Sequence, residues 1–93
     1  MIIGAAICEC ILYDPQSLKD KRAIIKSILS KAKQRYNLSA SEIDYQNIWQ
    51  RSKFAFVSVG TSRVHIEREL HHALALIDQR TDIERTVTSF EWL

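Results

Sequence analysis

The basic residues that open the first predicted helix offer the clearest chemistry in this sequence. Ser17, Lys19, Lys21 and Arg22 lie within one short segment. Cations near a helix N-terminus oppose the helix macrodipole, at roughly 0.3–1 kcal/mol each. A bound phosphate would offset that cost, because free backbone N–H groups and basic side chains converge on it. The segment therefore predicts an anion-binding site, and the alternative is a solvated helix face whose long side chains cover the core. Lys21 falls within the apolar stripe by helical angle, so we expect its stem to extend until the ammonium reaches the sheet edge.

The basic character continues along the same helix. Its flank carries Lys19, Arg22, Lys26 and Lys33, a spacing that suits contact with a nucleic-acid backbone. Residues 19–35 contain seven Lys or Arg and one Asp, a local charge of +6, so with a net charge of +2 the rest of the chain carries −4. This asymmetry indicates an anionic partner more clearly than the total charge does.

A turn between two predicted strands holds a second candidate, formed by Trp49, Gln50 and Arg51 with Lys53 after them. An indole for stacking, an amide that can read a base edge and a guanidinium for phosphate suit single-stranded RNA. The alternative is that Trp49 fills one end of the core and that Arg51 pairs with Glu42 or Asp44. Trp is usually largely buried, which favours the alternative.

The next strand carries Phe54 and Phe56, a partial match to the RNA-recognition-motif signature. The glycine and the final aromatic of that signature are missing here. The alternating pattern also places both rings on the inward side of the strand. We therefore expect them to pack in the core rather than to stack on bases.

No constellation in the sequence predicts catalysis or metal binding. The histidines include no pair spaced i, i+4, and the two cysteines are closer together than the usual zinc ligands. These residues are His65, His71, His72, Cys8 and Cys10. The carboxylates Glu9, Glu42 and Asp44 could cluster, but no nucleophile and base pair accompanies them. We expect a protein that is not an enzyme, with no catalytic residues, no metal and no cofactor.

Hydrophobic periodicity predicts six elements in the order β-α-β-β-α-β. The strands are expected at residues 2–13, 38–44, 53–61 and 83–92, and the helices from 18 to about 36 and from 62 or 63 to about 79. Even positions of the first strand are expected to face inward, because only the odd positions carry a charge. The order suggests a single α+β domain over residues 1–93. Its architecture would be the ferredoxin-like split β-α-β, with a four-stranded antiparallel sheet and two helices on one face.

Such a fold leaves the second face of the sheet open unless a partner covers it. The outward aliphatic residues on that face are Ile3, Ala5, Ile7, Ile11, Val57 and Val59. A patch of this kind predicts cover by a second copy of the chain, as a homodimer, or by another protein or a small ligand. The sequence has no run of ~20 apolar residues, no signal peptide and no disulfide framework. We therefore expect a cytoplasmic protein that does not enter a membrane.

Several short motifs resemble those of the YlxP-like bacterial family, also called domain of unknown function 503. They are the opening residues 1–4, the segment 17–22, Asp44 with Gln46, the segment 49–51, and Arg63, His65, Ile66 and Glu67. The resemblance covers nearly the whole chain and implies a ferredoxin-like fold. Genes of this family often lie beside those for translation initiation factor two and ribosome-binding factor A. The resemblance therefore implies a connection with RNA or the ribosomal particle, which is the first function that we predict. Cys8 and Cys10 depart from the family, since aliphatic residues are expected there.

Overall fold

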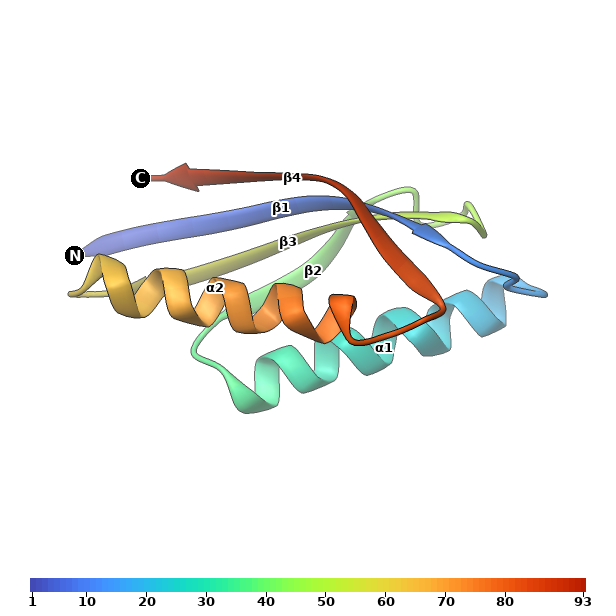
Figure 1. Cartoon of the computed structure of the whole chain (residues 1–93), viewed down its shortest axis with the longest axis horizontal. Helices are drawn as coiled ribbons and strands as arrows, with labels where there is room; N and C mark the ends of the chain where they lie inside the picture. Colours follow the sequence, from blue (N-terminus) through green and yellow to red (C-terminus); the bar gives the residue numbers. More distant parts are fainter.

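The computed structural model describes residues 1–93 as four strands and two helices. In chain order they are β1 (Ile2–Leu12), α1 (Leu18–Arg35), β2 (Ser39–Asp44), β3 (Arg51–Gly60), α2 (Arg63–Asp78) and β4 (Ile83–Trp92). The strands form one antiparallel sheet in the order β2-β3-β1-β4, and both helices lie on the same face of it (Figure 1). The predicted α+β, ferredoxin-like arrangement is confirmed. Neither helix is long and apolar enough to cross a membrane.

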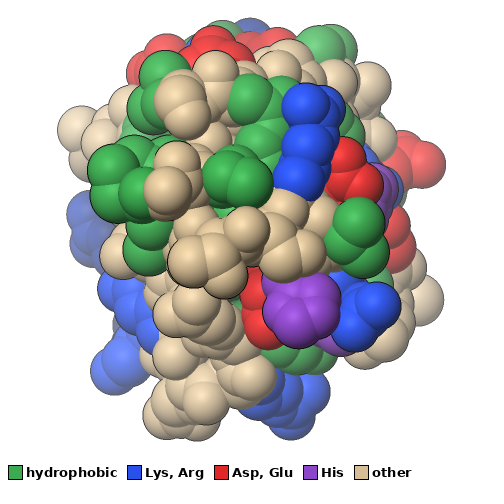
Figure 2. All heavy atoms as spheres, turned by 90° about the vertical axis from the view of Figure 1, so that its left-hand side faces the viewer, with side chains coloured by type: hydrophobic (Ala, Val, Ile, Leu, Met, Phe, Trp, Pro, Cys, Tyr) green, Lys and Arg blue, Asp and Glu red, His purple; other side chains and the backbone are tan.

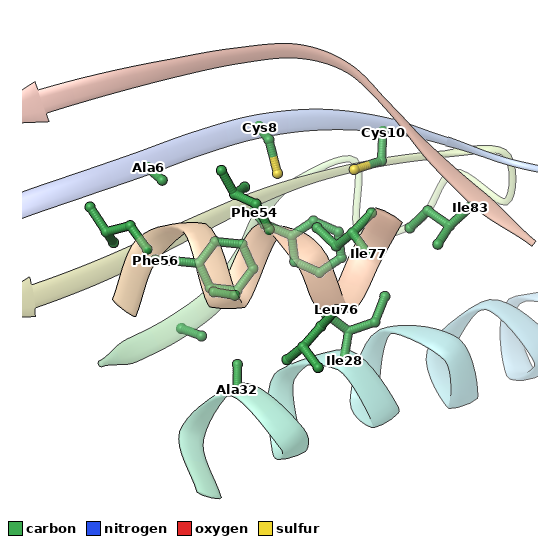
Figure 3. Close-up of a cluster of buried hydrophobic side chains, with 14 of the residues drawn as sticks. Ala6, Cys8, Cys10, Ile28, Ala32, Phe54, Phe56, Leu76, Ile77 and Ile83 are labelled. Atoms are coloured by element: carbon green, nitrogen blue, oxygen red, sulfur yellow. The ribbon is translucent and has the colours of Figure 1, made fainter. Parts of the chain in front are cut away.

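Alternation along β1 decides which side of the sheet becomes core, because successive side chains of a strand point to opposite faces. The even positions Ala6, Cys8, Cys10 and Leu12 are buried, as predicted. Figure 3 shows the first three of these projecting from β1 toward the helices. The odd positions consequently point to the open face.

Phe54 and Phe56 of β3 lie in the same core. Both rings are fully buried, and their centroids are 5.8 Å apart. Pairing between β1 and β3 places them beside Cys8 and Ala6, beneath the sheet. The prediction that they are core residues is confirmed, and base stacking in the manner of an RNA-recognition motif is wrong for this chain.

Helix α1 begins at a capped end and is held on the sheet by a buried stripe. Ser17 Oγ accepts a hydrogen bond from the Asp20 backbone N–H at 3.1 Å, as expected of an N-cap. The Asp20 carboxylate accepts from the Gln16 N–H at 3.1 Å, one residue earlier than in a standard capping box. The buried side chains of α1 are Lys21, Ile25, Ile28 and Ala32. The helix ends one residue earlier than predicted, because Tyr36 has an extended backbone.

A close contact at Gly4 positions the last strand against the first. Gly4 of β1 pairs with Trp92 of β4. A Cβ added at Gly4 would lie 2.7 Å from the Trp92 ring and 2.8 Å from Ile66 of α2. Both distances are shorter than van der Waals contact, so the indole occupies the space that any other residue at position 4 would need.

Candidate nucleic-acid interface

Lys21 extends toward the edge strand β2, as its position in the apolar stripe predicts, but its ammonium is buried there rather than exposed to solvent. Its side chain is 1% exposed, and its Nζ lies 3.2 Å from Glu42 Oε2. The same Nζ donates a hydrogen bond to the carbonyl oxygen of Tyr45. Ser52 Oγ donates to Glu42 Oε2 at 2.5 Å. Because Glu42 points to the helix side of β2, Lys21 finds its counter-charge inside and is not free to bind a phosphate.

The Lys21 contact with Tyr45 brings the two predicted sites together. Residues 45–50 form the turn between β2 and β3, and Tyr45 adopts a left-handed backbone with φ 62°. A second tie comes from the Leu12 N–H, which donates to the Gln50 carbonyl at 2.8 Å. The start of α1 and this turn therefore lie at the same end of the molecule, where β1 also ends (Figure 1).

Trp49 lies on the surface of this turn. Its side chain is 42% exposed, and the neighbouring Ile48 is 43% exposed. The interpretation that Trp49 fills one end of the core is wrong. At this end of the molecule, the space between the helices and the strands β2 and β3 is filled by the contacts among Lys21, Glu42 and Ser52, and not by the indole. An indole and an aliphatic side chain are thus available to a partner.

Arg51 pairs with an acid other than the two that were predicted. Its guanidinium lies 3.6 Å from Glu9 Oε1 and 4.2 Å from the centre of the Tyr45 ring. The strand β3 begins at Arg51, which pairs with Ile11 and so points to the open face, while Glu42 points to the helix side. The Tyr45 hydroxyl donates to Glu9 Oε1 at 3.0 Å, and this hydrogen bond raises the pKa of Tyr45. Glu9 therefore belongs to an open-face group rather than to a cluster with Glu42.

Lys53 follows on the same face of β3 and is partly buried, while Gln50 is exposed in the turn. Lys53 pairs across the strands with Glu9 on one side and with Asp44 on the other. The predicted group of Trp49, Gln50, Arg51 and Lys53 is thus gathered in one place. Its positive charge is reduced by Glu9.

Six cations remain exposed on α1, and they form the strongest charge feature of the molecule. They are Lys19, Arg22, Lys26, Lys31, Lys33 and Arg35. None of them has a carboxylate within 4.0 Å, whereas Arg51, Arg63, Arg80 and Arg85 are each paired. Figure 2 shows most Lys and Arg side chains in the lower part of the molecule, at the level of the helices.

Ser17 contributes to this surface as a helix cap only. Its hydroxyl oxygen is occupied by the Asp20 N–H, and the Asp20 carboxylate already supplies an anion at the first turn. Ser17 and Lys21 thus both have partners within the protein, and anion binding at the helix terminus stays a prediction. The flank formed by Lys19, Arg22, Lys26 and Lys33 remains exposed.

Comparison with known proteins places the chain in a family. Residues 3–90 match the sequence profile of the family described as "Protein of unknown function (DUF503)". The chain belongs to the DUF503 family. It is 52% identical over 91 residues to the "Uncharacterized protein YlxP" of Bacillus subtilis (strain 168), which covers 98% of this chain and 99% of that protein. The predicted family resemblance is confirmed.

Among solved structures, the DUF503 chain resembles the "De novo designed protein Foldit4". The TM-score is 0.56 at 14% identity, with 100% of this chain and 97% of the designed chain covered. At this level of identity the likeness concerns the fold alone.

The open face of the sheet carries an aliphatic surface, as the strand pattern predicts. Val57 and Val59 are 38% and 47% exposed, and Ile3, Ile7 and Ile11 are partly buried beside them. Ala5 is buried. Sequence reasoning missed Val87 of β4, which is 58% exposed and pairs with Glu9 of β1. Alternation from the buried Ile83 would place Val87 inward, and it faces outward because the register of β4 shifts opposite Glu9 and Cys10.

The largest hollow on the surface was not predicted from the sequence. It measures about 670 Å³ and lies between the end of α2 and the start of β4, with Tyr13 also in its lining. Most of its charges are already paired, and Glu84 Oε2 accepts a hydrogen bond from the Tyr13 hydroxyl at 2.5 Å. Arg85 holds both carboxylate oxygens of Asp78 at 2.8 and 2.7 Å, and Arg80 holds both of Asp82 at 2.8 Å. These hydrogen bonds lower the pKa of Asp82 and leave little free charge for a ligand.

The cysteines and histidines are not gathered into a metal site. No group of three His, Cys, Asp or Glu side chains in the structure could hold an ion. Cys8 and Cys10 are free thiols in the core, and their mutual hydrogen bond, with burial, raises the pKa of Cys10. The expectation that the protein uses no metal and no cofactor stays a prediction.

Proposed function

We propose that this protein binds RNA, as a non-enzymatic component that associates with ribosomal particles in the cytoplasm. The observation that supports this most is the row of exposed cations on α1, which lack carboxylate partners. Unpaired cations along one element are what neutralisation of a phosphate backbone requires. The ribosomal part of the proposal comes from the gene neighbourhood that the family resemblance implies.

The turn formed by residues 45–50 extends this surface. Trp49 is exposed in the same turn whose Tyr45 contacts Lys21 of α1, and it offers a flat ring for an unpaired base. Stacking of this kind contributes about 1–3 kcal/mol per base. Arg51 is partly neutralised by Glu9, so we assign it to orienting Tyr45 and the turn rather than to phosphate binding.

A matched pair of charge reversals tests the proposal. Arg22 on α1 and Arg68 on α2 are both exposed helical arginines without a carboxylate within 4.0 Å. Arg22→Glu is expected to weaken binding of labelled ribosomal RNA at low salt by at least tenfold, and Arg68→Glu to leave it within about threefold. The readouts are fluorescence anisotropy and co-sedimentation with ribosomal particles. If the parent protein binds no RNA at low salt, or if both variants bind as well as the parent, the proposal is wrong.

A second candidate function is self-association through the open sheet face. It is favoured by the exposed valines Val57 and Val59 of β3 and Val87 of β4, the two strands on either side of β1, which have no cover. Val57→Lys would place a charge at the centre of that face. A homodimer predicts that light scattering gives twice the chain mass for the parent and a single chain for the variant. A monomeric parent at high micromolar concentration would exclude this role.

A further inference from the structure

Cations lie on both flanks of α1. The predicted flank carries Lys19, Arg22, Lys26 and Lys33, which we call the outer flank. Lys31 and Arg35 were not part of any predicted site. At about 100° per residue they fall on the opposite side of the helix. Both line a cavity of about 220 Å³ between α1 and α2.

The lining of this cavity is cationic and contains no acid. It consists of Ile28, Lys31, Arg35, Leu76, Gln79 and Arg80. Asp82 holds two nitrogens of Arg80, and the third lies 3.4 Å from Ser27 Oγ of α1. Lys31 and Arg35 have no carboxylate within 4.0 Å. We call this group, Lys31 and Arg35 with Arg80, the inner flank.

Helix stability does not account for the inner flank. Arg35 in the last turn suits the helix macrodipole, but Lys31 lies one turn earlier. Like charges at i, i+4 destabilise a helix by roughly 0.2–0.5 kcal/mol. Two unpaired cations beside a cavity are therefore better explained by an anionic group that binds there.

Between the two flanks, α1 presents a ridge of short, uncharged side chains. Its residues are Ala23, Ser27, Ser30 and Gln34, spaced by three and four residues and opposite the buried stripe. Figure 2 looks at the end of the molecule where α1 finishes. There Lys and Arg side chains lie toward the lower left and the lower right, with uncharged atoms between them.

From this arrangement we infer that the RNA partner is double-helical and that α1 lies in its minor groove; the inference rests on the proposed function. A helix with side chains is about 10–12 Å across, so one phosphate backbone cannot contact both of its flanks. The two backbones that border a groove can do so.

The short ridge selects the kind of groove. A minor groove of A-form RNA is wide and shallow and displays 2′-hydroxyls, which Ser and Gln side chains can hydrogen-bond. The minor groove of B-form DNA is about 6 Å wide, too narrow for a helix. Its major groove admits a helix, but it displays no 2′-hydroxyls for the serine and glutamine side chains of the ridge, and the DNA duplex in the experiment below tests this alternative.

Salt-dependent binding distinguishes a helix that touches phosphates on two flanks from one that touches them on a single flank. The ligands are a blunt RNA duplex, the DNA duplex of the same sequence and the single RNA strand. The slope of log Kobs against log salt becomes shallower by about 0.9 for each phosphate of a duplex that a variant no longer neutralises. Lys19→Ala with Arg22→Ala should therefore make the slope for the RNA duplex shallower by about two. Lys31→Ala with Arg35→Ala should also make the slope for the RNA duplex shallower by about two, and Arg68→Ala should leave that slope unchanged.

A bulky, uncharged substitution on the ridge gives an independent readout. Ala23→Tyr should weaken binding of the RNA duplex at least tenfold and binding of the single strand by less than twofold, with circular dichroism unchanged. If the Lys31 and Arg35 variant keeps the parental slope, or if DNA or single-stranded RNA binds as tightly as the RNA duplex, the groove inference is wrong while RNA binding stands. If the parent binds none of the RNAs, the proposed function itself fails.

Discussion

Replacing Lys21 by Met tests how far the fold depends on its buried ion pair. Met keeps most of the volume and length of the side chain but removes the ammonium that faces Glu42 and Tyr45. The Glu42 side chain is only 14% exposed and would keep one donor, the Ser52 hydroxyl. Removing one partner of a buried pair costs about 3–5 kcal/mol. Since Glu42 lies near the edge of the sheet, we expect the lower end, about 3 kcal/mol.

For a domain of this size, 1 kcal/mol corresponds to about 4–8 °C in Tm, so Lys21→Met should lower the Tm by about 12–24 °C. Thermal melts and urea titrations measure this directly. The control is Lys21→Met combined with Glu42→Gln, whose neutral amide can still accept from Ser52. The double variant should recover at least half of the loss, because no unpaired charge remains. A single variant within about 1 kcal/mol of the parent, or a double variant that is less stable than the single, would refute the reasoning.

Three further predictions follow from the structure. Lys19→Glu with Arg22→Glu should abolish RNA binding while the Tm stays level or rises, because acids near the start of α1 suit the helix dipole; a melt well below the parent would mean that the cluster is structural. Gly4→Ala should cost about 1–3 kcal/mol in a urea titration, because its Cβ would lie 2.7 Å from Trp92. Asp82→Asn should lower the Tm at neutral pH more than at acid pH. The depressed pKa of Asp82 makes its contribution fully present above the unfolded pKa of about 3.9, and that contribution is lost as the pH falls through the lower folded value. An equal loss of Tm at both pH values would contradict this assignment.

The alternation of apolar residues was enough to predict both faces of β1 and the burial of Phe54 and Phe56. The reason is that side chains of a strand alternate between two faces, so one charged position identifies the face that points away from the core. The cap at Ser17 was also predictable, because it depends on residues within three positions along the chain.

The candidate site was harder to predict because it depends on pairing between distant segments. The helical angle of Lys21 correctly placed it on the core side, but the burial of its charge depends on Glu42, which is brought opposite only by the register of β2. The exposure of Trp49 has a similar origin. The turn is fastened by backbone contacts at Tyr45 and Gln50, which leave the indole outside. The second flank of α1 gains its cavity and its third cation only when α2 packs beside it.

Labelling of the two buried thiols of β1 reports global unfolding of the protein. Cys8 and Cys10 are 0% and 1% exposed on a strand that is paired on both sides, so local fraying at a sheet edge does not reach them. A thiol reagent therefore modifies them only after the sheet has come apart, and the rate of modification in plain buffer follows the equilibrium between closed and open chains when reclosing is fast. Two labels should appear together rather than one after the other, because both thiols are released in the same event.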